Sequence, residues 1–200
     1  MRTSLERMTR YQQITGGFFP FKETDIDGKK QNAIRPISGK NPKLVDMMEF
    51  IGELPENKKS IIWARFRPEI DIIVEALTKK YGAGAIAQFH GGINPEDRPF
   101  NNTKFQEDPE CRFMVTNQQT GARGQTWTAA SYELYFSNTF SYDDREQSES
   151  RAWGRVSKIN NTVIYVDFIL DHKNDRMITD AIARKMDVAA VVAEQLRNVV

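Results

Sequence analysis

The chain has 200 residues, of which 40% are hydrophobic and 28% are charged, with a formal net charge of +1. This length and composition fit one globular domain with a real core, and they exclude a disordered chain. No apolar run approaches the roughly 20 residues that cross a bilayer, so no membrane partner is expected. The single cysteine, Cys111, excludes a disulfide framework and a cysteine-rich zinc site, and it fits a reducing cytoplasm.

Residues 1–44 form a lead segment that is rich in basic side chains. Residues 4–14 predict a helix that ends at a Gly-Gly pair, and the Asp-Gly pair at 27–28 is typical of a β-hairpin. A further helix is predicted in SGKNPKLVDMMEFIGEL, residues 38–54, leading into the sheet. The excess of basic groups is compatible with a surface that touches phosphate and with a solvated linker.

Residues 45–200 alternate regularly between strand-like and helix-like stretches. Five short apolar runs predict strands: SIIWARF, AIAQFH, CRFMVTN, YELYFSN and TVIYVDFIL. Helices are predicted in between, with Asn94 capping the second and Ser141 the third, and one long amphipathic helix is predicted over 175–196. This alternation predicts an α/β domain with a mainly parallel sheet and helices on both faces.

The polar loops that follow three of these strands contain the candidate functional residues. They begin after His90, after Asn117 and after Asn138. Because ligands of parallel sheets gather at the carboxyl ends of the strands, we expect the three loops to share one edge. His90 itself is either a packed loop residue or a contact residue, and with only His172 besides it a metal site is not expected.

The stretch TNQQTGARGQTWTAAS contains two glycines and several hydroxyl groups after a strand. Such a loop can offer backbone N–H groups to a phosphate, but it is also an ordinary strand-to-helix turn. It is not a Walker A loop, since no Gly-Lys-Ser/Thr follows, and no Walker B acid pair follows a buried strand. The sequence therefore lacks the parts that bind magnesium and activate water in nucleotide hydrolysis.

The stretch DREQSESRAWGRV places Gln147, Arg151 and Arg155 four residues apart on a predicted helix. This spacing is compatible with a solvated face that carries ion pairs. It is also compatible with a row of side chains that reads phosphate groups. Arginines without a phosphate loop in the same chain favour a domain that completes the active site of another domain.

In order and spacing, these segments resemble the second RecA-like domain of superfamily-two helicases, most closely the Swi/Snf-type helicases and translocases of phages and bacteria. SIIWARFRPEIDIIVEAL is similar to motif IV, TGARGQTWTAAS to motif V, and YFSNTFSYDDREQSESRAWGRV to the strand and helix of motif VI. The resemblance implies a three-layer RecA-like (P-loop NTPase-like) domain over 45–200. It implies that residues 1–44 connect two motor domains.

The resemblance also implies a role for individual residues. Arg151, as an arginine finger, and Arg155 are the implied catalytic residues, and a guanidinium suits charge that develops on phosphate. The implied ATP-binding residues are Gln147, Gly121 and Gly124. The implied nucleic-acid contacts are Arg65, His90, Gly91, Thr120, Thr126 and Thr128. The implied cofactor is ATP, with Mg²⁺ held by an N-terminal RecA-like partner domain, and the other implied partner is DNA.

Two departures from the motif VI pattern leave alternatives open. The second arginine of the family falls on Gly154, with Arg155 displaced by one residue, and the histidine of the family is Trp153. Either Arg155 reaches the phosphate from a shifted helix end, or the domain is a catalytically degenerate lobe that binds DNA or protein. A lobe of a two-lobed glycosyltransferase would share the sheet architecture but not the motif order. The isolated chain is expected to lack ATPase activity, and a role in DNA replication or repair is expected.

Overall fold

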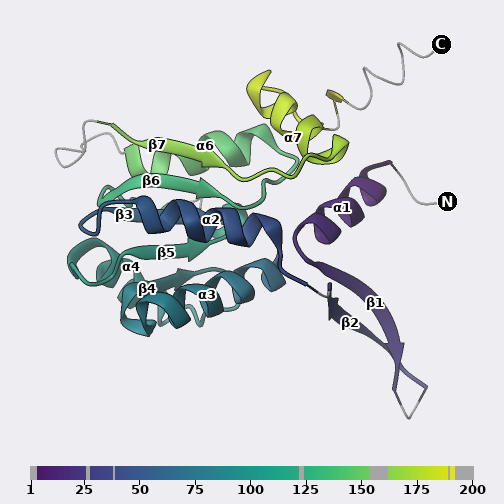
Figure 1. Cartoon of the computed structure of the whole chain (residues 1–200), viewed down its shortest axis with the longest axis horizontal. Helices are drawn as coiled ribbons and strands as arrows, with labels where there is room; N and C mark the ends of the chain where they lie inside the picture. Colours follow the sequence, from purple (N-terminus) through teal and green to yellow (C-terminus); the bar gives the residue numbers. More distant parts are fainter. Residues whose placement is uncertain are drawn as a thin grey trace.

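The computed structural model describes residues 4–25, 28–37, 39–121, 124–153, 162–188 and 190–191. Within these ranges, a β-hairpin precedes a five-stranded parallel sheet with the strand order β4-β5-β3-β6-β7 (Figure 1). The chain moves from the central strand β3 to one edge of the sheet and then returns to build the other edge. The connections that leave β3 and β6 therefore diverge, and the crevice between the carboxyl ends of these strands is the topological switch point.

Each sheet strand overlaps one of the five predicted apolar runs, and β3 and β6 begin one and two residues before theirs. The strands are β3 (Lys59–Trp63), β4 (Ile86–Phe89), β5 (Phe113–Thr116), β6 (Ala130–Tyr135) and β7 (Ile164–Asp167). The central strands are continuous apolar runs because both faces of the sheet are covered: Ile62 packs on one side, and Ile61 and Trp63 pack on the other.

Helices cover both faces of the sheet and form three layers with it. On one face lie α2 (Pro42–Glu53) and α3 (Arg67–Tyr81), whose apolar side chains join the core cluster that contains Ile62. On the other face lie α4 (Arg98–Glu107) and α6 (Tyr142–Trp153), whose Phe105 and Ala152 join the cluster that contains Trp63. A short 3₁₀ helix, η1 (Ala83–Ala85), leads into β4, and the one-turn helix α5 (Gln118–Gly121) follows β5. The predicted three-layer RecA-like fold is confirmed.

Two predicted helices end or begin elsewhere than expected. Helix α4 begins at Arg98 and not at Pro95, because Pro99 has no N–H group to donate and is tolerated in the first turn. The predicted C-terminal helix is broken: α7 (Lys173–Ala183) ends in a turn where Lys185 has φ 55°. There the N–H of Met186 donates to the carbonyl of Ala181, as in a Schellman motif. The part of that prediction beyond residue 191 lies outside the described residues.

The lead segment lies beyond the carboxyl ends of the strands. Helix α1 (Ser4–Thr15) is followed by the hairpin strands β1 (Phe18–Thr24) and β2 (Lys30–Pro36), which project away from the sheet (Figure 1). The predicted hairpin is confirmed, and Asp27 of its turn lies outside the described residues. The predicted division of the chain at residue 44 stays a prediction.

Gly121, in the one-turn helix α5, offers a test of the packing on the α4 and α6 face. A Cβ atom there would lie 3.0 Å from Trp63 Cζ3 and from Trp127 Cη2, and it would collide with Thr116 Oγ1. We expect Gly121→Ala to lower the free energy of unfolding by roughly 1–3 kcal/mol, because both indole rings are buried and held in place. Gly84→Ala is the matched control, since its Cβ would meet nothing within 4 Å. Urea unfolding of both variants decides the point, and equal stabilities would contradict this account.

Candidate functional site

The predicted site residues fall into two groups, and they do not all share one edge of the sheet. Arg65, His90, Gly91 and Thr120 follow strand ends and lie at the carboxyl edge. Helix α6 starts at that edge but runs back along the sheet, so that Arg151 lies beside the loop that precedes β6. The expectation of one common edge is therefore wrong for motif VI. A helix that connects two parallel strands must return its C-terminus to the amino edge of the sheet.

Helix α6 is fastened to the sheet by Arg145, which is buried. Its guanidinium group forms an ion pair with Asp167 of β7, at 2.6 Å, and another with Glu149, also at 2.6 Å. It lies over the ring of Tyr135, 3.4 Å from the ring centroid, and donates to Asn138 Oδ1. Burial disfavours its charge, but hydrogen bonding to Asp167 and Glu149 together with the charges of Asp167 and Tyr135 outweighs this effect and raises the pKa of Arg145. The guanidinium group and the two carboxylates thus satisfy each other's hydrogen bonds, and a charge buried there without its partner would be costly.

The last turn of α6 is fastened by a second buried charged group, Glu133 in the middle of β6. One carboxyl oxygen accepts from Trp63 Nε1, at 2.8 Å, and from the hydroxyl of Tyr135, at 2.9 Å. The other accepts from the backbone N–H of Ala152, at 3.3 Å. Burial raises the pKa of Glu133 to about 7, against the effect of these three donors. The carboxyl group thus joins β3, β6 and the end of α6.

Arg151 forms hydrogen bonds that join α6 to the glycine-containing loop. Its Nη1 donates to the carbonyl of Gln125, at 2.6 Å, and its Nε donates to the carbonyl of Gln147, at 2.9 Å. In return, its own carbonyl accepts from the backbone N–H of Trp127, at 2.8 Å. Nη2 donates to Ser150 Oγ, so that two of the five guanidinium N–H groups have no acceptor within the described residues. The side chain of Gln147 is exposed on the same helix, one turn earlier.

The two glycines of this loop have different surroundings. Gly121 is buried under the rings of Trp63 and Trp127, so packing explains the absence of a side chain there. Gly124 is exposed and has φ 72°, the left-handed conformation that favours glycine. The hydroxyl-bearing residues are spread along the loop: Thr120 lies at the carboxyl edge, whereas Thr128 lies 3.5 Å from Gln106 Nε2 at the end of α4. Thr126 is exposed between them.

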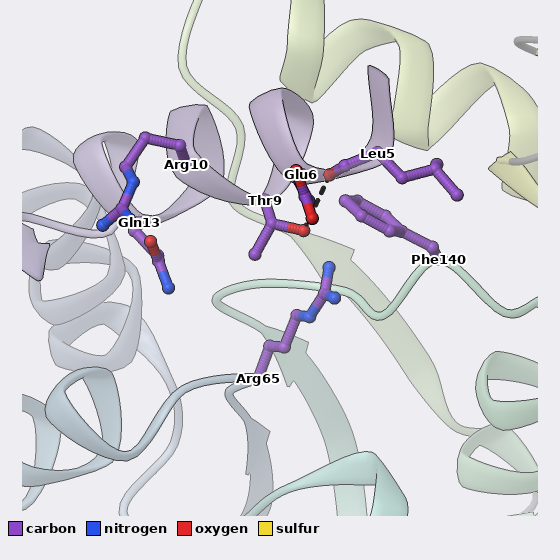
Figure 2. A pocket seen from close by; sticks show the side chains of 7 residues that line it. All are labelled: Leu5, Glu6, Thr9, Arg10, Gln13, Arg65 and Phe140. Atoms are coloured by element: carbon purple, nitrogen blue, oxygen red, sulfur yellow. Dashed lines mark hydrogen bonds between the residues drawn. The ribbon is translucent and has the colours of Figure 1, made fainter. Parts of the chain in front are cut away.

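At the carboxyl edge, Arg65 lies between the sheet and α1 (Figure 2). Its guanidinium group stacks on Phe140, 4.0 Å from the ring centroid, and its Nη1 donates to Gln12 Oε1, at 2.6 Å. The amide of Gln12 then donates to the carbonyl of Asn138, at 2.7 Å. The side chain of Gln12 therefore occupies the switch point between the ends of β3 and β6. Next to it, Arg65 and Phe140 line an open cavity of about 660 Å³ together with residues of α1.

His90 is buried, and its ring is held by neighbours on three sides. The N–H of Gly92 donates to Nδ1, at 3.1 Å, and Nε2 lies 3.1 Å from Gln88 Oε1, which fits a neutral ring protonated on Nε2. Arg67 approaches Nδ1 at 2.9 Å. Burial lowers the pKa of His90 to about 4, with the charge of Arg67 acting in the same direction. His90 thus shapes the loop that exposes Gly91, and its contact with nucleic acid stays a prediction.

Sequence reasoning missed Gln12, Glu133 and Arg145. The signal for Glu133 was an acidic residue inside the apolar run YELYFSN, where a buried carboxyl group needs donors. Arg155 lies outside the described residues. Among the described residues, no three His, Cys, Asp or Glu side chains come together in a way that could hold a metal ion. In the same part of the chain, no helix is both long and apolar enough to span a membrane.

More than half of the chain matches a known family. Residues 39–156 match the family model described as the helicase conserved C-terminal domain. No curated protein sequence matches the chain.

Three solved structures share the fold. The Sulfolobus solfataricus SWI2/SNF2 ATPase core in complex with dsDNA is 21% identical with a TM-score of 0.62, and the match covers 90% of this chain and 35% of that one. The C-terminal part of the Fun30 ATPase domain is 18% identical with a TM-score of 0.60, covering 68% and 44%. The C-terminal domain of the DEAD-box protein Dbp5 is 18% identical with a TM-score of 0.57, covering 73% and 79%. The chain thus spans less than half of the first two proteins.

The pKa of Glu133 predicts an unusual pH dependence of stability. A carboxyl group whose pKa rises from 4.5 to about 7 on folding stabilises the protein below pH 4.5, and this contribution is lost as the pH rises through 7. The lowered pKa of His90 acts in the opposite direction, because its contribution is lost as the pH falls from 6.5 towards 4. The effect of Glu133 must therefore be measured as a difference between variants.

We expect the free energy of unfolding of the wild type, relative to that of Glu133→Gln, to fall between pH 4.5 and 8, by on the order of 3 kcal/mol. Denaturant titrations at four or five pH values measure this difference. Glu75→Gln, at an exposed position, is the control and should show a constant difference. A constant difference for Glu133→Gln as well would contradict the assignment.

Proposed function

Because the chain belongs to the helicase conserved C-terminal domain family, we propose that it is the C-terminal motor domain of a Swi/Snf-type, ATP-dependent DNA helicase or translocase. The proposal takes the order of motifs IV, V and VI together with the shared fold of the SWI2/SNF2 ATPase core as its support. In it, the chain supplies cationic and DNA-contacting side chains to a site that is completed by an N-terminal RecA-like domain.

The observation that carries the proposal is the arrangement of Gln147 and Arg151 on α6. Both lie on the outer side of a helix whose inner side is fixed by Arg145 and Glu133. Arg151 retains two N–H groups without an acceptor in the described part of the chain, while its other donors hold it in place. A guanidinium group that is fixed before the substrate arrives stabilises developing charge without a further cost of reorganisation.

The residues present fit the phosphate part of ATP but not its metal ion. Arg151 and Gln147 offer N–H donors for phosphate oxygens, and among the described residues no acidic cluster could hold Mg²⁺. The proposal therefore assigns Mg²⁺ and the attacking water to the N-terminal domain. When ATP is bound there, it supplies the phosphoryl group, and this chain holds a positive charge against the transferred phosphate.

For DNA, the proposal uses residues at the carboxyl edge and in the glycine-containing loop. Arg65, Gly91 and Thr120 lie at that edge, and Gly124 and Thr126 are exposed in the loop. Backbone N–H groups, hydroxyl groups and a guanidinium group are the donors that bind phosphate oxygens of DNA without reading the sequence. Such contacts suit a motor that moves along DNA of any sequence.

We expect DNA-stimulated ATP hydrolysis only when the chain is combined with the N-terminal RecA-like domain that carries Walker A and Walker B. Arg151→Ala should lower the turnover number of this assembly by about 10³-fold or more, because an arginine finger contributes this much to phosphoryl transfer. Phosphate release in the presence of duplex DNA measures the rate. Arg176→Ala removes an exposed arginine of α7 and should leave the rate unchanged. Robust hydrolysis by this chain alone would overturn the proposal.

ATP hydrolysis by the same assembly also distinguishes an active motor domain from a catalytically degenerate lobe. If Arg155 performs the role of the arginine that Gly154 replaces, Arg155→Ala should also abolish hydrolysis while binding of ATP persists. An assembly that remains inactive with DNA, in the wild type as in both arginine variants, would favour a lobe that only binds DNA or protein.

A further inference from the structure

The hairpin β1–β2 carries aromatic and basic side chains that the core does not use. Phe18 anchors the hairpin, since it is buried and packs edge-on against Phe66 with the ring centroids 5.6 Å apart. By contrast, Phe19 is 42% exposed and Ile34 is 52% exposed, on strands that project away from the sheet (Figure 1). The exposed aromatic side chains therefore have no structural role comparable to that of Phe18.

A guanidinium group lies over each of two aromatic rings of the hairpin. Arg10 of α1 lies over Phe19, 5.2 Å from its centroid, and Arg35 lies over Phe21, 5.0 Å from its centroid. Phe19 pairs with Arg35 across the hairpin, and side chains alternate along a strand, so Phe19, Phe21 and Arg35 share one face. Within the described residues, no carboxylate forms an ion pair with Arg10 or Arg35. Glu23 lies on the same face but nearer to the tip.

This face is continuous with the cavity beside Arg65. Arg10 lines that cavity, and it also lines a second hollow of about 390 Å³ on the hairpin, together with Phe19, Phe21 and Lys22. In Figure 2, Arg65 extends towards α1 from beyond the end of β3, and Arg10 projects from α1 past Gln13. A strand of nucleic acid that contacts Arg65 at the carboxyl edge can therefore continue past Arg10 onto the hairpin.

We propose that the face formed by Arg10, Phe19, Phe21 and Arg35 binds single-stranded DNA, with bases stacked on the rings and guanidinium planes and phosphates paired with the charges. Alternating aromatic and cationic groups are the features with which proteins hold single strands of any sequence. Bases within a duplex are stacked on each other and cannot stack on phenyl rings, so the face discriminates between single and double strands. The inference builds on the proposed function in taking DNA as the nucleic acid.

Fluorescence anisotropy with a labelled oligo(dT) of about 20 nucleotides and with a duplex of the same length tests the inference on the full chain. We expect the double variant Phe19→Leu/Phe21→Leu to bind oligo(dT) roughly tenfold or more weakly, because stacking is removed while apolar surface is kept. Binding of the duplex should change less than about twofold. Ile164→Ala, an exposed apolar residue on the edge strand β7, is the control and should change neither affinity.

A second pair of substitutions tests the charges. Arg10→Gln/Arg35→Gln should weaken oligo(dT) binding and reduce the slope of log affinity against log salt by about 0.7 for each phosphate group that the variant no longer neutralises. Circular dichroism should match the wild type for both double variants, since none of the four side chains belongs to the core. Thermal unfolding should match for the leucine variant, whereas the glutamine variant also loses the hydrogen bond from Arg10 Nη1 to the carbonyl of Pro20.

Unchanged oligo(dT) binding in the leucine variant would overturn the inference, as would an equal loss of affinity for the duplex. Tighter binding of the corresponding RNA, abolished in the same variant, would overturn the assignment to DNA. The outcome is separable from that of the proposed motor function. Arg151→Ala should leave oligo(dT) binding intact. An assembly without ATPase activity would contradict the motor function but not the binding of single-stranded DNA by the hairpin face.

Discussion

The carboxyl group of Glu133 is the interaction on which the arrangement of the predicted motif VI helix depends. A carboxyl group in a buried strand is costly unless it is fully hydrogen-bonded. Here its donors come from β3, β6 and the last turn of α6, through Trp63, Tyr135 and Ala152. Moving the end of α6 would leave the buried group with fewer donors. Since the neighbouring Arg151 exchanges hydrogen bonds with the loop around Gln125 and Trp127, that loop is placed by the same constraint.

The carboxyl edge is organised by a second polar contact, which comes from outside the sheet domain. Gln12 of α1 bridges Arg65 after β3 and the carbonyl of Asn138 after β6, in the crevice where parallel sheets usually bind ligands. The buried pair of Lys43 and Asp175 supports it nearby, with Thr15 donating to the same carboxylate. The position of α1 and the orientation of Arg65 are therefore coupled. A shift of the lead segment would therefore also change the orientation of Arg65, the predicted DNA contact.

The sequence determined the elements better than their relative positions. Apolar runs such as SIIWARF predicted the buried strands because both faces of the sheet are covered, and this burial leaves a local pattern. The break in α7 was missed because it rests on Lys185 in a conformation that glycine usually adopts, so no breaker residue marks it. The bridge by Gln12 and the donors to Glu133 join residues far apart in the chain, and no periodicity records such contacts. The position of Arg151 does not follow from the strand before α6, because a helix between parallel strands ends at the opposite edge of the sheet.

The glycine-containing loop has a large buried side chain, Trp127. A side chain of this size in a packed core causes strain unless its neighbours leave room for it. In this chain the indole is buried against Trp63 and above Gly121, and its Nε1 donates to Asn102 Oδ1 at 2.6 Å. A buried indole N–H needs such an acceptor. The indole is thus accommodated by a glycine, a second tryptophan and an asparagine from three different segments. The conformation of the loop is therefore set by contacts with the core of the domain.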